Sequence, residues 1–316
     1  MKSTQLSLFT RENKLIHYYF QGIYYQSYRT IIVQLSSHKV LAALLTCSVV
    51  YLIYSAPNVS SHSKHHEIKN TIHTTPPSIN NTREVFLIKR QLLVAQFLVK
   101  EKVSRVEQLP SKALLTLNKE ISDLFLRIVL KEQALPPHVK KFFTSSHPLK
   151  KVETALMEQA KYHIPASITL AQAALETGYG QHVTGNNFFG IKDKTGALKN
   201  PSVTTEYFDE KEYQSNYLKI KDSQVITISG KKLYKCTIKD TFAHYPSAWA
   251  SFRAHSKHLS NNKRYHTLFT KGKNYEAWAS LLGSTKKGGI GYATDPNYGQ
   301  SICRIIQKYH LDLLDY

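Results

Sequence analysis

The chain has 316 residues, with 42 Lys and Arg against 22 Asp and Glu, which gives a formal net charge of +20 at pH 7. Such a charge predicts a polyanionic partner: nucleic acid, an anionic membrane or an acidic cell-wall polymer. Hydrophobic residues make up 42% of the chain, enough to build a sizeable core. Three cysteines exclude a disulfide scaffold and a four-thiolate zinc site. Cys236 and Cys303 could form one bridge in an exported domain or stay as two buried thiols.

An apolar run at residues 40–56 follows a basic N-terminal segment, residues 1–39. The run holds no charged residue, and its length of about 17 residues is at the short end for a membrane-spanning helix. Lys and Arg outnumber acidic residues five to one before it, so the positive-inside rule places the N-terminus in the cytoplasm. The run is therefore predicted to be a single-pass signal anchor in the inner (cytoplasmic) membrane, with the C-terminal part on the periplasmic or extracytoplasmic side. A buried core helix is the alternative.

Two segments separate this run from the C-terminal half of the chain. Residues 57–83 are rich in Ser, His, Asn and Thr and have no periodicity, which predicts a flexible stalk. Residues 84–149 carry apolar stripes that predict two helices, at 84–106 and 111–133, separated by proline breaks. Each helix has a wide apolar face that needs a partner. The pair is expected either to pack against the next domain or to self-associate.

One acidic residue stands in an otherwise apolar helix. After an amphipathic helix at Lys151–Tyr162, a second helix is predicted to begin with Ser167 as its N-cap and to end at Gly178. Glu176 is the only charged residue between positions 165 and 180. A carboxylate there loses hydration, which raises its pKa and keeps it protonated near neutral pH, as the general acid of a glycosidase requires. The alternative is a Glu side chain that points into solvent.

The segment after this helix combines amides with aromatic rings. Asn186, Asn187, Phe188 and Phe189 stand together between two glycines. Amides form hydrogen bonds with sugar hydroxyls, and aromatic faces stack on sugar rings. These four residues are therefore predicted to bind substrate, with a tight loop around a buried Phe pair as the alternative.

The stretches 164–180 and 186–192 resemble the glucosaminidase domain of glycoside hydrolase family 73, which includes flagellar and autolysin-type peptidoglycan hydrolases. The resemblance covers residues 150–316 and implies an α+β, lysozyme-like fold with a mostly helical lobe and a small β-lobe. It also implies hydrolysis of the β-1,4 bond after N-acetylglucosamine in cell-wall glycan, without a cofactor and with Glu176 as the acid. Thr177 and Phe188 stand where members more often have Ser and Leu, and both departures are mild.

The resemblance also points to a second carboxylate. The segment around Glu206 is similar to the family stretch whose Glu lies in the β-lobe, so Glu206 is the expected second catalytic group. Asp209, Glu210 and Glu212 are alternatives nearby. Inverting, retaining and substrate-assisted mechanisms all remain open, because they differ in carboxylate spacing or in whether a nucleophilic carboxylate is needed.

Three tyrosines complete the expected site. Tyr292, whose family counterpart lines the active site, is expected to act in catalysis by steadying the acetamido group or the developing oxocarbenium charge. Tyr179 and Tyr298 are expected to contact substrate. Asp295 and Pro296 are predicted to be the N-cap and the first residue of the last helix, so Asp295 is assigned no catalytic role.

The segment between these motifs predicts the β-lobe and the return to the helices. Val225–Ile228 and Leu233–Ile238 are β-rich runs around a short turn with glycine, which predicts a hairpin. Trp249 and Phe252 lie in a segment similar to the family's return to the helical lobe, and both are expected to pack in the interior.

The expected partners follow from these assignments. His255 and His258 could ligate zinc as an i,i+3 pair, but no third ligand is in register, so a solvated helix face is favoured and no metal is expected. Nucleic acid is disfavoured, because the basic residues are scattered and an exported domain does not meet it. The predicted partners are peptidoglycan glycan strands and, through the N-terminal helix, the membrane, while oligomeric state is left open. A lytic transglycosylase or muramidase on the same fold, or a non-catalytic wall-binding module, are the rival functions.

Overall fold

The computed structural model describes residues 79–193, 195 and 201–316. The prediction of a membrane-spanning helix at residues 40–56 and most of the predicted stalk therefore lie outside the described residues. Within the described ranges, no helix combines the length and apolar character needed to cross a membrane. The described residues within 79–97 and 109–316 belong to one compact unit.

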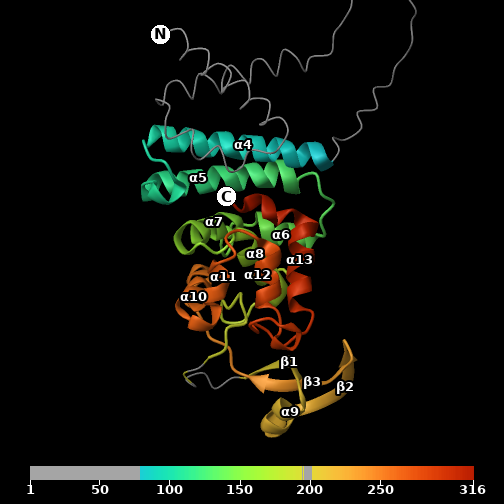
Figure 1. Ribbon diagram of the computed structural model, residues 1–316. Helices are drawn as coiled ribbons and strands as arrows, with labels where there is room; N and C mark the ends of the chain where they lie inside the picture. The colour runs from blue at the N-terminus through green and yellow to red at the C-terminus, as the bar shows by residue number, and fades with distance from the viewer. Residues whose placement is uncertain (1–78, 194, 196–200) are drawn as a thin grey trace, which may run out of the picture. The chain divides into compact units, whose positions relative to one another are not determined.

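Among the described residues, three α-helices precede the predicted catalytic region: α4 (Ile79–Lys100), α5 (Ser111–Phe125) and α6 (Pro137–Thr144). Both expected helices are present, but a wider π-helical turn at Leu126–Leu130 follows α5, where the periodicity predicts one helix to residue 133. The buried rings of Phe86 and Phe125 pack edge to face, with 5.7 Å between their centroids. This contact holds α4 and α5 side by side (Figure 1).

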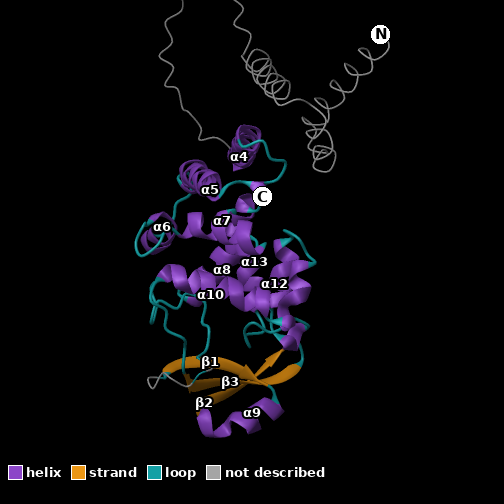
Figure 2. Cartoon of the chain, turned by 90° about the vertical axis from the view of Figure 1, so that its left-hand side faces the viewer, coloured by secondary structure: helices purple, strands orange, loops and turns teal. Residues whose placement is uncertain are grey.

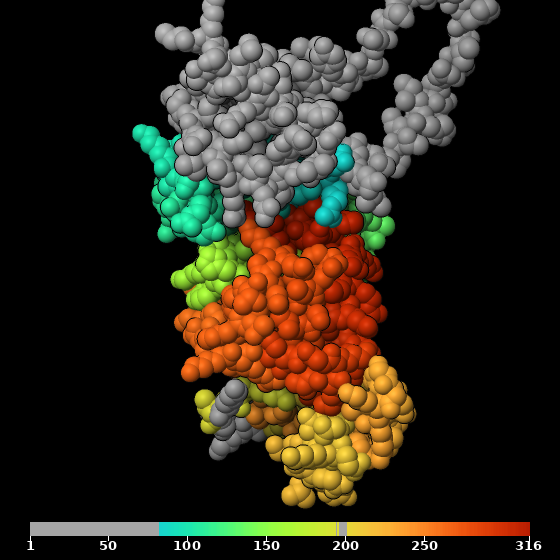
Figure 3. Space-filling view, viewed as in Figure 1, coloured from blue at the N-terminus to red at the C-terminus, as the bar shows by residue number. Residues whose placement is uncertain are grey.

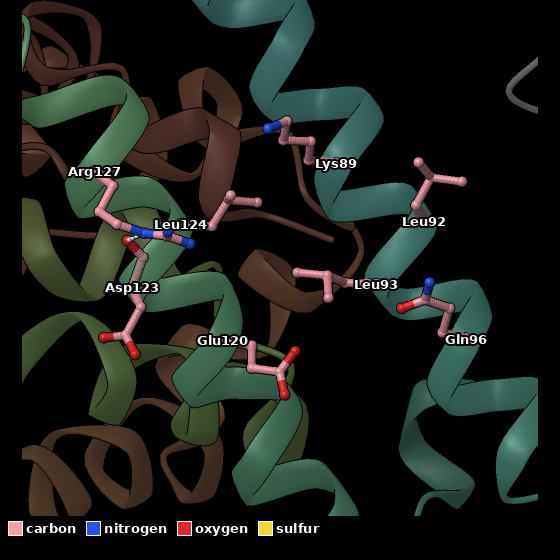
Figure 4. A pocket seen from close by; sticks show the side chains of 8 residues that line it. All are labelled: Lys89, Leu92, Leu93, Gln96, Glu120, Asp123, Leu124 and Arg127. Atoms are coloured by element: carbon pink, nitrogen blue, oxygen red, sulfur yellow. Dashed lines mark hydrogen bonds between the residues drawn. The ribbon is translucent and has the colours of Figure 1, made fainter. Parts of the chain in front are cut away.

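An open groove lies between α4 and α5 (Figure 4). Its walls combine three leucines with charged and amide side chains, namely Lys89, Leu92, Leu93, Gln96, Glu120, Asp123, Leu124 and Arg127. None of the residues predicted to bind or cut substrate lines this groove.

The C-terminal tail fastens these helices to the rest of the unit. Arg90, which is buried in α4, donates hydrogen bonds to the main-chain oxygens of Leu313 and Asp315. The hydroxyl of Tyr316 donates to the side chain of Asn118 in α5. Of the two expected arrangements, the structure therefore shows the helices packed against the domain that follows them.

The centre of the helical lobe is α8 (Ala166–Glu176). It contacts α7 (Lys151–Tyr162), α12 (Tyr275–Leu282) and α13 (Tyr298–Tyr309), and nine of its residues are buried. Small and aliphatic side chains on every face allow α8 to be enclosed in this way. Figure 2 shows α8 among its neighbours. Helix α10 (Ala248–Asn261) packs against α7, and the short α11 (His266–Phe269) follows it.

The predicted N-cap of α8 is wrong. Pro165 occupies the cap position with a φ of −52°, which is already suited to entering a helix, and no side chain caps the first turn. Ser167 lies inside the helix, and its backbone N–H and hydroxyl both donate to Asp315. At the other end the prediction is confirmed, because Gly178 has a φ of 53° just after the last helical residue.

The β-lobe is a three-stranded antiparallel sheet in the order β1-β3-β2. Its strands are β1 (Ser202–Phe208), β2 (Ile220–Ile228) and β3 (Lys231–Asp240), and β2 and β3 confirm the predicted hairpin. Ser229 and Gly230 both have positive φ at its turn, as two-residue hairpin loops require. Helix α9 (Glu210–Asn216) covers the face of the sheet turned away from the helices (Figure 2).

Two other predictions about the helical lobe need correction. Trp249 is 45% exposed, whereas its predicted companion Phe252 is fully buried. The guanidinium of Arg253 lies 4.8 Å from the centre of the Trp249 ring and keeps that ring at the surface. Helix α13 begins at Tyr298 rather than at Pro296, because Asp295 accepts a hydrogen bond from the Asn297 N–H in a turn before the helix.

Each of the two cysteines among the described residues is a free thiol. Cys236 is buried in the core of the β-lobe, beside Phe208 and Tyr234, and Cys303 is partly exposed on α13. The structure therefore holds two thiols and not the bridge that the sequence left open.

In the space-filling view of Figure 3, the residues of the β-lobe gather at one end of the unit.

Candidate active site

Glu176 is the last residue of α8, where the helix leaves the core. The hydroxyl of Thr177 fixes this exit, because it donates to the Ala173 carbonyl at 2.6 Å and accepts from the Gly180 N–H at 2.8 Å. Burial of the carboxyl group raises the pKa of Glu176 to about 7, against a hydrogen bond from Tyr298 that lowers the pKa. The group therefore exchanges its proton near neutral pH, as predicted for a general acid.

Two stacked tyrosines stand beside this carboxyl group. The hydroxyl of Tyr298, in the first turn of α13, donates to Oε1 of Glu176 at 2.7 Å. The ring of Tyr292 lies almost parallel to that of Tyr298, with 5.7 Å between centroids, and its hydroxyl donates to the Phe189 carbonyl at 2.7 Å. Burial raises the pKa of both phenols well above the ordinary value, so both tyrosines are neutral. The structure thus brings both predicted tyrosines to Glu176.

The loop after α8 holds its shape through one amide. Asn187 donates to the carbonyls of Ile191 and Ala243, and its oxygen accepts from the N–H groups of Phe189 and Ile191. The side chain of Asn187 is therefore fully used within the protein and shapes the loop. The neighbouring Asn186 has a φ of 57° and donates to the Tyr245 carbonyl at 2.9 Å.

The predicted stacking of Phe188 and Phe189 on sugar is contradicted by their burial. Phe188 is 1% exposed and Phe189 is not exposed at all, and both rings pack against Phe252. The alternative of a tight loop with a buried Phe pair is the correct one: Gly185, Asn186 and Gly190 have the positive φ angles of a tight loop, and Phe252 packs against both rings.

Tyr179 lies in a different cluster from the two tyrosines at Glu176. It has a φ of 58° just after α8, and its ring packs against His138, Phe142 and Tyr309. Its predicted role in substrate binding has no support in these ring contacts.

The β-lobe contributes Glu206, from the middle of β1. Its side chain is 10% exposed and forms an ion pair with Lys192 at 2.8 Å, and Thr294 donates a hydrogen bond to it. The negative charge of Glu206 is one of the causes that raise the pKa of Glu176, so the two carboxyl groups share one electrostatic environment. Lys192 also pairs with Asp240 at 2.8 Å.

The other acidic candidates of the β-lobe have structural roles. Asp209 and Glu212 form a capping box at the start of α9. Glu210 accepts a 2.5 Å hydrogen bond from the Tyr234 hydroxyl and pairs with Lys232. Among these acidic residues, Glu206 is the one whose charge acts on Glu176.

The sequence prediction is wrong for His255, and it assigns no role to Gln172. His255 is not on a solvated face but fully buried, because α10 turns it toward the core together with Phe252, and its ring stacks on Phe189 at 3.9 Å. Gln172 is also fully buried, and its Nε2 donates to the Tyr298 hydroxyl at 3.0 Å. The signal for Gln172 was available, since it stands four residues before Glu176 and thus on the same helix face.

Gly190 leaves space beside the carboxyl group of Glu176. Gly190 has a φ of 61°, and a Cβ atom at this position would lie only 2.8 Å from Oε2 of Glu176. A side chain here would therefore fill the space next to that oxygen. Across the part of the chain that the structure describes, no cluster of three or more His, Cys, Asp or Glu could hold a metal ion.

Two known proteins are similar to this chain in sequence. The exo-glucosaminidase LytG of Bacillus subtilis is 34% identical over 163 residues, which cover 49% of this chain and 48% of LytG. The peptidoglycan hydrolase FlgJ of Vibrio cholerae is 29% identical over 148 residues, covering 45% of this chain and 36% of FlgJ. The chain thus spans less than half the length of either relative.

A solved structure shows a weaker similarity. The N-acetylmuramoyl-L-alanine amidase of Staphylococcus aureus superposes with a TM-score of 0.41 at 24% identity, covering 58% of this chain and 44% of that one.

A family model matches the C-terminal half of the chain. Residues 152–311, which are 160 of the 316 residues, match the family described as mannosyl-glycoprotein endo-beta-N-acetylglucosaminidase. With just over half of its length matched, the chain belongs to this glucosaminidase family.

Proposed function

We propose that the protein is a peptidoglycan hydrolase, an endo-N-acetylglucosaminidase that cleaves the β-1,4 bond after N-acetylglucosamine with Glu176 as general acid. The observation that carries this proposal is a carboxyl group with a pKa raised to about 7, at the end of a buried helix and beside two neutral tyrosines. Family membership and the activities named for the two relatives, an exo-glucosaminidase and a peptidoglycan hydrolase, agree with it.

Proton donation follows from this environment. Burial stabilises the neutral form of Glu176, so the group arrives at the glycosidic oxygen with its proton. As the bond breaks and the proton leaves, the carboxylate that forms keeps the hydrogen bond from Tyr298. That hydrogen bond is stronger to the charged form, which favours the transfer step.

Glu206 is the group that we assign to the other side of the reaction. Lys192 and Thr294 each hold one of its oxygens, so its orientation is fixed while further lone pairs stay available. It could activate water as a base, act as a nucleophile, or stabilise positive charge while the substrate acetamido group attacks. In each of these mechanisms its negative charge faces the developing oxocarbenium ion.

We also propose that the enzyme is a single-pass protein of the inner membrane, with the catalytic domain on the periplasmic or extracytoplasmic side. This proposal rests on the uncharged run at residues 40–56 and on the excess of Lys and Arg before it. The net charge of +20 supports attraction to an anionic wall polymer, an effect that added salt should weaken.

Mass spectrometry of purified peptidoglycan digested by the full-length protein, wild type beside Glu176→Gln, tests the reaction. Reducing N-acetylglucosamine ends that appear only with the wild type are expected, in fragments of mixed length as an endo-acting enzyme produces. Disaccharides alone would replace the endo assignment with an exo one. Anhydromuramic ends would assign a lytic transglycosylase, and reducing N-acetylmuramic acid ends a muramidase. Binding without cleavage by either protein would make the chain a wall-binding module.

A further inference from the structure

A chain of three hydrogen bonds runs from the acid into the core of the helical lobe. Tyr298 donates to Oε1 of Glu176 at 2.7 Å, and Nε2 of Gln172 donates to the Tyr298 hydroxyl at 3.0 Å. Oε1 of Gln172 lies 3.0 Å from Nε2 of His255. Gln172 and His255 are both fully buried, and Tyr298 is 3% exposed. The four side chains come from α8, α10 and α13, so the chain joins the three helices around the site.

Chemistry fixes the direction of these bonds. An amide oxygen only accepts, so Nε2 of His255 must carry a proton if Oε1 of Gln172 faces it. The amide nitrogen of Gln172 then donates to Tyr298, whose own O–H is left to point at Glu176. In this arrangement Nδ1 of His255 is an unprotonated nitrogen.

The opposite direction of hydrogen-bond donation is disfavoured because of Nδ1 of His255. If Glu176 donated to Tyr298 and Tyr298 to Gln172, the amide would have to turn and donate to His255, which would move the imidazole proton to Nδ1. That atom is buried and has no hydrogen-bond partner among the described residues. A buried N–H without a partner is rarer and costlier than a bare acceptor. The structure therefore favours the direction that ends on Oε1 of Glu176.

We propose that Gln172 and His255 are positioning residues that aim the Tyr298 hydroxyl at Oε1 of Glu176 and thereby place the transferable proton on Oε2. This inference rests on the proposed function, since it assigns which oxygen of the general acid donates. Oε1 already accepts a hydrogen bond, so a neutral carboxyl group carries its proton on the other oxygen. Oε2 is the oxygen beside Gly190, where the missing side chain leaves space for a glycosidic oxygen.

The surroundings keep His255 neutral, as this arrangement requires. Its ring lies flat on Phe189 at 3.9 Å, and burial, followed by the charge of His258, lowers its pKa to about 3. Tyr292 faces it edge-on with 6.2 Å between centroids and is itself neutral. Around Glu176 the titratable neighbours are Tyr292, Tyr298 and Glu206.

A packing role alone does not account for this polar chain. α8 is otherwise enclosed through apolar and small side chains, and an aliphatic residue in place of Gln172 would bury no amide. Buried polar groups that satisfy one another fix a single geometry, which apolar packing does not do. The polar chain ends on Glu176, the carboxyl group that donates the proton in the proposed reaction.

Histidine ¹⁵N NMR on the full-length wild type tests the direction of the chain without any assay of activity. Comparison with His255→Gln assigns the His255 signal. We expect a neutral ring with its proton on Nε2 from about pH 5 to pH 8. A proton on Nδ1, or an imidazolium in that range, overturns the proposal. If the wild type cleaves no peptidoglycan, the proposed function fails while this spectrum still decides whether the chain of bonds exists.

The pH dependence of kcat tests the consequence for the acid. In Gln172→Met the Tyr298 hydroxyl is no longer held toward Oε1, so the carboxylate form loses a hydrogen bond and the pKa of Glu176 rises. The basic limb of the profile should move up by about one pH unit, and kcat should fall on the order of tenfold with KM unchanged. An unmoved limb in a folded Gln172→Met variant contradicts the proposal.

A matched pair at position 255 separates hydrogen bonding from packing. His255→Phe keeps an aromatic ring on Phe189 but has no donor, whereas His255→Gln places an amide N–H near the position of Nε2. The basic limb should move up in His255→Phe and return toward its wild-type position in His255→Gln. Equal limb positions in the two variants would show that only packing matters. Circular dichroism of each variant checks its fold, and if His255→Phe does not fold, the wild-type NMR spectrum decides alone.

Discussion

Helix α8 has a carboxyl group at each end, and the two share a raised pKa but not a role. At its start, both oxygens of Asp315 accept hydrogen bonds from Ser167, at 2.9 and 2.6 Å. At its end, Glu176 accepts one hydrogen bond, from Tyr298, and its other oxygen faces Gly190. Burial is the main cause that raises each pKa to about 7.

The two carboxyl groups differ in how many of their oxygens accept hydrogen bonds from the protein. Ser167 binds both oxygens of Asp315 and so fixes the C-terminal tail on α8, whereas Oε2 of Glu176 accepts no hydrogen bond from the described residues. A perturbed pKa marks a group that burial has changed, and structural groups show it as well as catalytic ones. The free oxygen, and not the pKa, distinguishes Glu176, the proposed general acid, from Asp315.

The largest expected effect is on kcat, when Glu176 and Asp315 are each replaced by the corresponding amide. Glu176→Gln should lower kcat by roughly 10²- to 10⁴-fold, because the amide cannot supply a proton to the leaving oxygen. Asp315→Asn, at the other end of the same helix, should keep kcat per folded molecule near that of the wild type. Initial rates on labelled peptidoglycan, normalised to folded protein, measure both. More than a tenth of wild-type activity in Glu176→Gln would remove it from the role of general acid.

The second prediction concerns the negative charge of Glu206. Glu206→Gln removes the negative charge that helps to raise the pKa of Glu176, so the basic limb of the pH–kcat profile should move to lower pH. This shift is opposite in sign to that expected for Gln172→Met. In addition, kcat should fall by roughly 10²-fold if Glu206 acts on water or on the oxocarbenium ion.

Glu210→Gln is the matched control for Glu206. It removes a carboxylate of the same lobe that binds Tyr234 and Lys232 rather than the site. The basic limb should stay where it is in the wild type. A limb that moves equally in both variants would show that the net charge of the β-lobe acts at long range, and would remove the specific assignment of Glu206.

The elements that the sequence predicted well are those with local signals. The apolar stretch before Glu176, the glycine that ends α8 and the Ser229–Gly230 turn are each determined by neighbours in the chain, and the structure confirms them. Glu176 itself could be found because a single charge in an apolar helix needs an explanation at the level of the sequence alone.

The errors arise where the direction of a side chain depends on distant parts of the chain. Whether Phe188 and Phe189 face substrate or core is set by α10, through Phe252, about sixty residues away. His255 stands three residues after Phe252 on the buried face of α10, so its spacing indicates burial, but its partners Phe189 and Gln172 come from distant parts of the chain. The N-cap of α8 was misplaced because Ser167 bonds to Asp315, at the very end of the chain.

The stability of the protein should reflect both ends of α8 alike. A carboxyl group whose pKa is raised by folding binds its proton more tightly in the native state, so the free energy of unfolding is largest below its unfolded pKa and falls as pH rises toward the folded pKa. For Asp315 this window runs from about pH 4 to about pH 7. The expected loss is on the order of 1 kcal/mol per pH unit for each group.

Asp315→Asn and Glu176→Gln should each make this decline less steep, because each removes one such group. Urea unfolding curves at intervals between pH 4.5 and pH 7.5 measure the slope. The two variants then resemble each other in stability and differ in activity, which sharpens the distinction between the ends of α8. A slope that neither variant changes would show that both groups are solvated more than their surroundings imply.

The smallest effect is expected where the tail that carries Asp315 meets α4. Arg83 forms an ion pair with Asp312 at 2.6 Å, but its side chain is 44% exposed, so Arg83→Ala should cost at most about 1 kcal/mol. Arg90 is buried and donates to main-chain oxygens of the tail, so Arg90→Ala should cost about 1–3 kcal/mol, since those buried acceptors lose a charged donor. Urea unfolding at one pH compares them. If Arg83→Ala is the costlier of the two, the exposed ion pair and not the buried hydrogen bonds of Arg90 holds the tail on α4. The hydrogen bonds between Ser167 and Asp315 would then depend on an exposed, salt-sensitive contact.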